Sequence, residues 1–202
     1  MKRRLVCIVE GQGEVAAIPN LCARILNHLG VSDWVVGRDP IRCKRSALVD
    51  ARHPRPRRAC REEEVLKLME LALRRPHLAD AVLLLCDEDE DCAAGWGPDA
   101  TRVMGQRAAG AAVMAVHEYE TWLLLNRSDE ELRAAGVPVP VMGRGAKSAL
   151  RKLVPDYSPT IHQLQETQRI KDIAALSQRS ESFDKLVRSI ASLCSPTKKT
   201  GG

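Results

Sequence analysis

Hydrophobic and polar positions follow two different periods along the chain up to Asn126. Continuous apolar runs of strand length alternate with segments in which apolar residues recur every three or four positions, as on one face of a helix. The candidate strands are residues 4–9, 33–38, 80–86 and 111–116, and the candidate helices are residues 14–29, 61–73 and 99–108. Strands that alternate with helices favour a parallel sheet covered by helices. The pattern therefore predicts an α/β, Rossmann-like fold with a mostly parallel sheet.

Beyond Asn126 the pattern changes to short helical segments separated by loops that contain proline and glycine. The candidate helices there are residues 128–135, 146–153, 169–178 and 180–193. We expect a main domain over residues 1–126 and a helical extension over residues 127–194 that packs on the sheet. Residues 195–202 read SPTKKTGG and have nothing to bury, so we expect a disordered tail there.

The composition is that of a globular protein with an aliphatic core. Hydrophobic residues make up 45% of the 202 residues, charged residues 28% and aromatic residues 3%. No apolar run approaches the roughly 18 residues that a membrane helix needs, and the apolar stretch after Arg4 is too short for a signal peptide. Seven cysteines without a CxxC pair indicate reduced thiols. We therefore expect a soluble, cytoplasmic protein.

Positive charge is concentrated in one segment of the chain. Between Arg42 and Arg61 there are eight basic residues and one acid, whereas the net charge of the whole chain is +5. The candidate nucleic-acid-binding residues of this segment are Arg42, Lys44, Arg45, Arg55, Arg57 and Arg58. Such a segment is typical of contacts to the phosphates of a polyanion. A solvated loop broken by prolines would have the same composition.

Acidic residues follow three of the four candidate strands. Glu10 and Glu14 come after the first strand, residues 87–91 (DEDED) after the third, and Glu118 and Glu120 after the fourth. Because the carboxyl ends of parallel strands meet at one edge of a sheet, these side chains should lie close together. Consecutive acids repel one another unless a cation or a ring of donors compensates their charge. The sequence therefore predicts a positive group at this edge.

A divalent metal ion is the cation that we expect. The candidate metal ligands are Glu10, Asp87, Asp89, Asp91 and Glu120. Hard ions such as Mg²⁺, or Mn²⁺ in its place, prefer the oxygen ligands that these residues supply. On an extended segment alternate side chains point the same way, so Asp87, Asp89 and Asp91 would share one face. Glu10 would be a metal ligand or a general base.

Other motifs near the strand ends suit the same chemistry. Gly11 and Gly13 would let the backbone turn sharply and let a phosphate approach. Trp96, in an expected glycine-rich loop, is the best candidate for stacking on a base. The GRGAKS stretch at residues 143–148 lacks the spacing of a P-loop, so we expect no ATP site. Each motif alone also occurs in ordinary turns and solvated loops, and it is their joint occurrence that favours a site.

Two sets of residues resemble a known family. Glu10 and Gly11 with Glu14 after the first strand, followed by a hydrophobic strand that ends in residues 87–89 (DED), resemble the Toprim domain. This domain is shared by topoisomerases, DnaG-type primases, small ribonucleases of 5S rRNA maturation and OLD-family nucleases. The stretches HEYETWLLLN, GAKSAL and RSESFDKLV resemble the DUF4276 group of Toprim-like proteins. Together these resemblances cover nearly the whole chain.

The resemblance implies metal-dependent phosphodiester chemistry. It implies Glu10 as acid or base, Asp87 and Asp89 as Mg²⁺ ligands, and Glu14 as a ligand of a second metal. Similar proteins tend to carry a lysine near the position of Tyr157, and Lys147 could supply that positive charge here. The resemblance also implies a role in prokaryotic anti-phage defence or DNA processing, beside an ATPase partner of the ABC or AAA type.

Three functions are compatible with these observations. The first is a Toprim-type nuclease that hydrolyses phosphodiester bonds of DNA or RNA with one or two metal ions. The second is a different DxD enzyme, namely a metal-dependent glycosyltransferase or phosphatase. The third is a non-catalytic Toprim-like subunit that docks on an ATPase. An exposed sheet edge or the helical extension could also support a homodimer.

Overall fold

The computed structural model describes residues 2–50, 52, 59–74, 78–89, 91–141 and 143–195. Arg55, Arg57, Arg58 and most of the expected tail lie outside these residues. The strands are β1 (Arg3–Val9), β2 (Trp34–Val36), β3 (Ile41–Arg42), β4 (Ala81–Asp87) and β5 (Gly110–Ala115). All paired strands are parallel, in the order β2-β1-β4-β5, with β3 beside the end of β1. The predicted α/β, Rossmann-like fold with a mostly parallel sheet is therefore confirmed.

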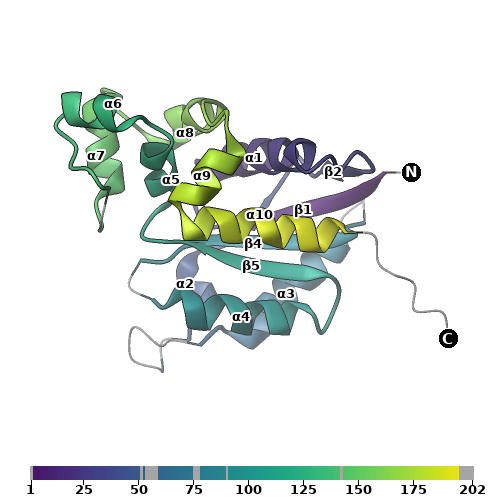
Figure 1. The fold of residues 1–202 in the computed structure, drawn as a ribbon. Helices are drawn as coiled ribbons and strands as arrows, with labels where there is room; N and C mark the ends of the chain where they lie inside the picture. The colour runs from purple at the N-terminus through teal and green to yellow at the C-terminus, as the bar shows by residue number, and fades with distance from the viewer. Residues whose placement is uncertain are drawn as a thin grey trace.

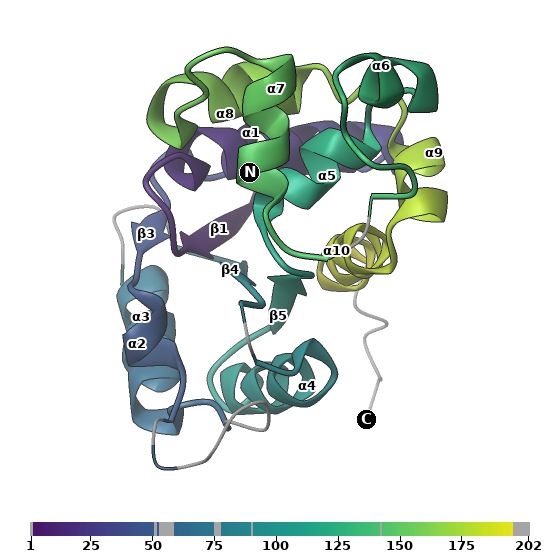
Figure 2. The ribbon, with the colours of Figure 1, turned by 90° about the vertical axis from the view of Figure 1, so that its left-hand side faces the viewer.

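Helices cover both faces of this sheet (Figures 1 and 2). One face carries α1 (Glu14–His28), α5 (Tyr119–Leu125) and α10 (Glu181–Cys194), and the other carries α2 (Arg45–Leu48), α3 (Glu62–Leu73) and α4 (Ala93–Met104). Alternate residues of a strand point to opposite faces. Leu83 therefore packs in one hydrophobic cluster with α1, while Leu84 packs in the other with α3 and α4. This burial on both faces explains why the strands read as continuous apolar runs.

The expected helical extension consists of several short helices followed by one long one. They are α6 (Asp129–Ala134), α7 (Ala146–Leu153), α8 (Pro159–Gln168), α9 (Ile173–Arg179) and α10. Leu150 and Leu186 belong to the same hydrophobic cluster as Leu83 of the sheet, so these helices extend the core of the sheet. Among the described helices, none combines the length and the apolar character that crossing a bilayer requires.

Two helix boundaries differ from the prediction. The segment with Gly95, Gly97 and Pro98 is not a loop, because α4 begins at Ala93. Packing of the buried Trp96 against the sheet outweighs the low helix propensity of its neighbours. The predicted helix at 169–178 is wrong in its first part. Residues 169–172 are not helical and connect α8, which begins at a proline and ends at Gln168, to α9, whose N-terminus is capped by the Asp172 side chain.

Candidate active site

Carboxylates from the ends of three elements meet at the carboxyl edge of the sheet, as predicted. Glu10 follows β1, Asp87 ends β4 and Glu120 lies in the first turn of α5, which follows β5. Burial, and then the charges of Glu14, Glu120 and Glu10, hold the pKa of the Asp87 carboxyl well above its ordinary value. The four carboxyl groups are thus close enough to disfavour one another's ionised forms.

Glu14 closes the turn between β1 and α1. Its Oε2 accepts hydrogen bonds from the backbone N–H groups of Glu10 and Gly11, both at 3.1 Å. The positive end of the helix dipole also stabilises the negative charge of an acidic side chain in the first turn, where Glu14 lies. Nevertheless burial raises the pKa of Glu14 to about 7. One oxygen of Glu14 therefore shapes the loop, while the charge of the group remains poorly compensated.

Hydrogen bonds from the backbone orient Glu10 and Asp87. Glu10 Oε2 accepts from the backbone N–H of Asp87 at 3.3 Å, which joins the ends of β1 and β4. Asp87 Oδ1 accepts from the backbone N–H of Tyr119 at 2.8 Å, which joins β4 to the start of α5. Burial is the largest cause that raises the pKa of Glu10. These bonds hold both side chains in place, and each leaves the second carboxylate oxygen without a hydrogen bond from the described residues.

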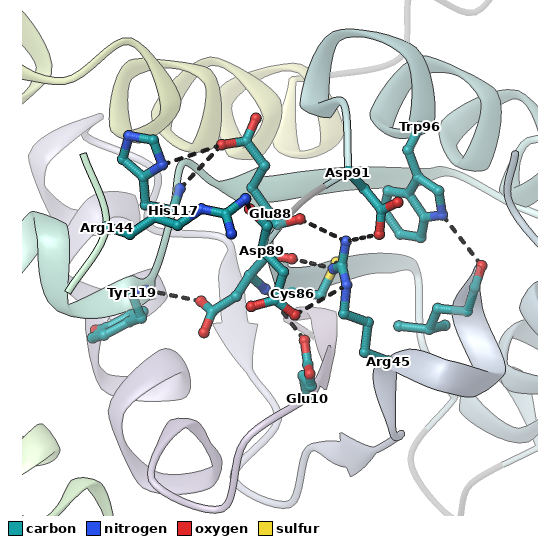
Figure 3. A network of polar contacts seen from close by, with 12 residues as sticks. Glu10, Arg45, Cys86, Glu88, Asp89, Asp91, Trp96, His117, Tyr119 and Arg144 are labelled. Atoms are coloured by element: carbon teal, nitrogen blue, oxygen red, sulfur yellow. Dashed lines mark hydrogen bonds and ion pairs between the residues drawn. The ribbon is translucent and has the colours of Figure 1, made fainter. Parts of the chain in front are cut away.

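Arg45 supplies the positive group that the run of acids requires (Figure 3). Its buried guanidinium donates to the backbone oxygens of Asp87 and Glu88, the latter at 2.7 Å, and to Asp91 Oδ2 at 2.5 Å. Asp89 Oδ2 lies 3.3 Å from its Nε. The sequence suggested that Arg45 contacts nucleic acid and that Asp91 contacts a metal. In the structure the two side chains form an ion pair with each other.

The acidic loop turns sharply after Asp87. Strand pairing ends where the Glu88 N–H donates to the Ala115 carbonyl oxygen, and Asp89 has a φ of 49°, in the left-handed region. The expectation of an extended segment with Asp87, Asp89 and Asp91 on one face is therefore wrong. Glu88 faces away from the other acids, and its carboxylate accepts from the backbone N–H of His117 at 3.1 Å. Asp tolerates positive φ better than most residues, which permits this turn.

Glu120 is held between Lys147 and Tyr157. Its Oε1 accepts a hydrogen bond from the Tyr157 hydroxyl at 3.2 Å and lies 3.9 Å from Lys147 Nζ. Burial raises the pKa of Glu120, and the positive charge of Lys147 opposes this shift. Glu118 uses Oε2 to accept from the backbone N–H of Lys147 at 2.9 Å. Lys147 therefore lies beside the carboxylates, as the sequence suggested.

Sequence reasoning missed two contributors to this site. Tyr157 was noted only where similar proteins carry a lysine, yet its hydroxyl binds Glu120. The sequence prediction does not include Arg144, whose guanidinium donates to the carbonyl oxygen of Asp89 at 2.7 Å. A glycine-flanked basic residue close to Lys147 was the available signal. On the opposite side of the site, the exposed Arg42 donates to Gln12 Oε1 at 2.5 Å, and Lys44 is exposed.

Trp96 is not available to stack on a base. It is 1% exposed, and its Nε1 donates to the carbonyl oxygen of Leu48 at 3.2 Å. The prediction failed because it placed Trp96 in a loop, whereas the residue lies on the inner face of α4. Within the residues that the structure describes, Trp34 and Trp122 are also buried. Stacking on tryptophan is therefore not a feature of this site.

A comparison with family models, curated proteins and solved structures found no match to this chain. The site is therefore interpreted from its own geometry.

The donor set at the strand ends suits a hard divalent cation. Glu10, Glu14, Asp87 and Glu120 offer oxygen ligands, and their raised pKa values show that positive charge would favour their ionised forms. Across the described part of the chain, no three acidic, histidine or cysteine side chains already surround a common metal position. The carboxylates would have to converge further to hold an ion.

Gly13 is required for packing, and we expect Gly13→Ala to destabilise the protein by about 1–3 kcal/mol. A Cβ at Gly13 would lie 1.9 Å from Gln163 Oε1 and 2.6 Å from the carbonyl oxygen of Pro159, both in α8. The sequence suggested instead that this glycine admits a phosphate. Urea unfolding measures the effect.

The matched control is Gly95→Ala in α4, where a Cβ would have nothing within 4 Å. An alanine there should stabilise the helix by roughly 0.5–1 kcal/mol. Equal stability of the Gly13→Ala and wild-type proteins would contradict the packing role of Gly13.

Proposed function

We propose that this protein is a nuclease of the Toprim type that hydrolyses phosphodiester bonds with Mg²⁺ or Mn²⁺. The observation that carries the proposal is the group of four carboxylates, Glu10, Glu14, Asp87 and Glu120, at the carboxyl edge of a parallel sheet. Glu14 and Glu120 are buried, and Glu10 and Asp87 are half-buried. Ligand sites of open α/β sheets lie at this edge. A folded protein has little reason to bury several carboxylates together unless a cation binds them.

The residues of the site have complementary roles in this proposal. Asp87, Glu10 and Glu120 would hold the metal, which when bound supplies positive charge to the phosphate and its leaving oxygen. Glu10 would also take up or release a proton. Lys147 lies 3.9 Å from Glu120 and is 43% exposed, so its ammonium group can reach a phosphate oxygen beside the carboxylates.

Basic side chains flank the carboxylates on two sides, which supports a polyanionic substrate. Arg42 and Lys44 are exposed on the β3 side, and Arg144 is exposed on the side of the acidic loop. Such contacts bind the backbone of DNA or RNA without reading its sequence. Nucleic acid is accordingly the substrate that we propose, and neither a nucleotide sugar nor a small phosphate ester would need so wide a basic border.

Location and partners follow from the same proposal. All seven cysteines are free thiols, which suits a reducing cytoplasm. The proposal also keeps a role in anti-phage defence or DNA processing together with an ABC-type or AAA-type ATPase partner, on the strength of the resemblance of residues 117–126, 145–150 and 179–187 to Toprim-like proteins. A pull-down from the native host with the purified chain would test this part separately.

Cleavage of a substrate panel tests the proposed activity. Purified protein is incubated with plasmid, linear duplex, single-stranded DNA and total tRNA, with Mg²⁺, Mn²⁺ or EDTA. We expect cleavage of at least one substrate with metal and none with EDTA, and loss of cleavage in Glu10→Gln. Cleavage that persists in EDTA, or in Glu10→Gln, would contradict the assignment of the site.

A further inference from the structure

A groove of about 420 Å³ lies at the open edge of β5. Among the described strands β5 ends the sheet order, and α10 and α4 lie above and below it in Figure 1. Residues of both helices line the groove. Its lining includes Ala94, Gly97 and Pro98 of α4, Met114 of β5, and Glu181 and Lys185 of α10. The groove also reaches Glu88, the residue that follows Asp87, so it borders the acidic loop on the side away from the other carboxylates.

The backbone edge of β5 is capped at two points. Ala112 N–H donates to the Thr101 hydroxyl of α4 at 2.9 Å, and Val116 N–H donates to the Ser182 hydroxyl of α10 at 3.3 Å. Successive residues of a strand direct their N–H and C=O groups alternately to its two sides. Met114 lies between the two capped residues, so its N–H and C=O point into the groove. Met114 is 3% exposed, so this donor and this acceptor lie side by side at the bottom of the groove.

This floor is too short for an added strand. Pairing of an extended peptide with a sheet edge needs several consecutive residues. Here Thr101 and Ser182 occupy the N–H groups on either side of Met114. Gly97 packs against the carbonyl oxygen of Ala112, since a Cβ at Gly97 would lie 3.4 Å from it. A single flat group that bears one acceptor beside one donor would match this floor.

We propose that this groove binds an unpaired nucleobase of the nucleic acid whose backbone lies at the candidate active site. The inference rests on the proposed function and deepens it, because it makes single-stranded or locally unpaired nucleic acid the substrate. A base offers acceptor and donor groups on one edge and apolar faces that suit Ala93, Pro98 and Met114. Lys185 is exposed at the rim, where it can contact the adjoining phosphate. The groove volume of about 420 Å³ leaves room for one base.

Cys92 provides a reporter inside the groove. It lines the groove and is half-buried, and Cys43 is the other cysteine that is not buried. In Cys43→Ser/Asp87→Asn protein, which should not cleave, a maleimide would therefore label Cys92 selectively. We expect a short oligothymidylate to slow labelling about 10-fold or more, and an oligonucleotide of abasic residues of the same length to have no effect, since contacts to a base contribute much of the binding.

A blocking variant tests the position of the base. Ala94 is exposed on α4 and lines the groove, so Ala94→Trp should fill it, remove the protection of Cys92 and raise KM for single-stranded substrate. Ala134→Trp, at an exposed position of α6, is the matched control and should behave as the parent protein. Equal protection by the abasic oligonucleotide would overturn the proposal, because it would locate phosphate in the groove.

The two proposals can fail separately. Cleavage in the substrate panel without any protection of Cys92 would contradict the proposed base site and would still support the proposed nuclease activity. Protection of Cys92 by oligothymidylate without cleavage of any substrate would support the base site and contradict the proposed nuclease activity. Protection by a short valine and threonine peptide in place of the oligonucleotide would overturn the base site in favour of a peptide groove.

Discussion

Replacing Asp87 with asparagine is expected to abolish metal-dependent cleavage and, at the same time, to stabilise the metal-free protein. Cleavage should fall at least about 100-fold, because metal ligation contributes several kcal/mol to such reactions. The melting temperature in EDTA at pH 8 should rise by about 3 °C or more, which corresponds to roughly 1 kcal/mol in a chain of this size. Cleavage assays and calorimetry on the same preparations measure both effects.

The opposite signs follow from the environment of Asp87. Its pKa in the folded protein is raised, first by burial and then by the charges of Glu14, Glu120 and Glu10. The folded state therefore binds a proton more tightly than the unfolded state, and this contribution to stability is lost as the pH rises through the folded pKa. Asparagine is neutral at every pH, so the variant should lose less stability than the wild type between mildly acidic pH and pH 8.

The control for this prediction is Asp156→Asn. Asp156 is exposed and has a φ of 57°, a conformation that asparagine also tolerates. The Asp156→Asn variant should have the same cleavage activity and the same pH dependence of unfolding as the wild type. If Asp87→Asn lowers the melting temperature in EDTA, groups of the protein already compensate the negative charge of the carboxylates without a metal. The main argument for a cation site would then fail.

Arg45→Met is expected to destabilise the protein by about 3–5 kcal/mol, as removal of one partner of a buried ion pair commonly does. Methionine keeps much of the volume of the aliphatic stem but leaves Asp91, which is 4% exposed, without the guanidinium 2.5 Å away. The carbonyl oxygens of Asp87 and Glu88 lose donors as well. Equilibrium unfolding in urea measures the free energy of unfolding.

A double variant separates the ion pair from packing. Asp91→Asn removes the buried charge, so Arg45→Met/Asp91→Asn should be more stable than Arg45→Met alone. Arg188→Met is the control for a lost surface pair with Asp184, because the two side chains are 65% and 38% exposed, and it should shift the urea midpoint much less. A double variant no more stable than Arg45→Met would show that the charge of Asp91 is not the cause.

The convergence of carboxylates could be predicted from the sequence because it depends on topology alone. Once β1, β4 and β5 are parallel neighbours, residues that directly follow them must meet at one edge. The repulsion within residues 87–91 likewise predicted a positive group nearby. Its identity could not be predicted, because Arg42, Lys44 and Arg45 look alike in composition. The difference is that Arg45 and Leu48 share a face of the short α2, and Leu48 is fully buried.

Errors in the prediction occurred where tertiary contacts outweigh local preference. Gly95 and Gly97 favour a loop, yet Trp96 between them anchors a helix because its ring fills the space below the sheet and its N–H binds Leu48. The turn at Asp89 was also missed, since an extended segment was the simplest continuation of β4. Arg45 and Arg144 hold carbonyl oxygens of this turn from distant parts of the chain.

The contacts of Arg45 also bear on the order in which the protein folds. Forty or more residues separate Arg45 from the loop that it holds. Contacts between distant residues form late, because the intervening chain must first lose its freedom. The pairing of β1 with β4 brings the two segments together, so the acidic loop should close on Arg45 only after the sheet exists. Interactions that form after the transition state slow unfolding and leave the folding rate unchanged. The carboxylates would therefore remain hydrated during collapse, and the arginine would act chiefly to prolong the lifetime of the finished site.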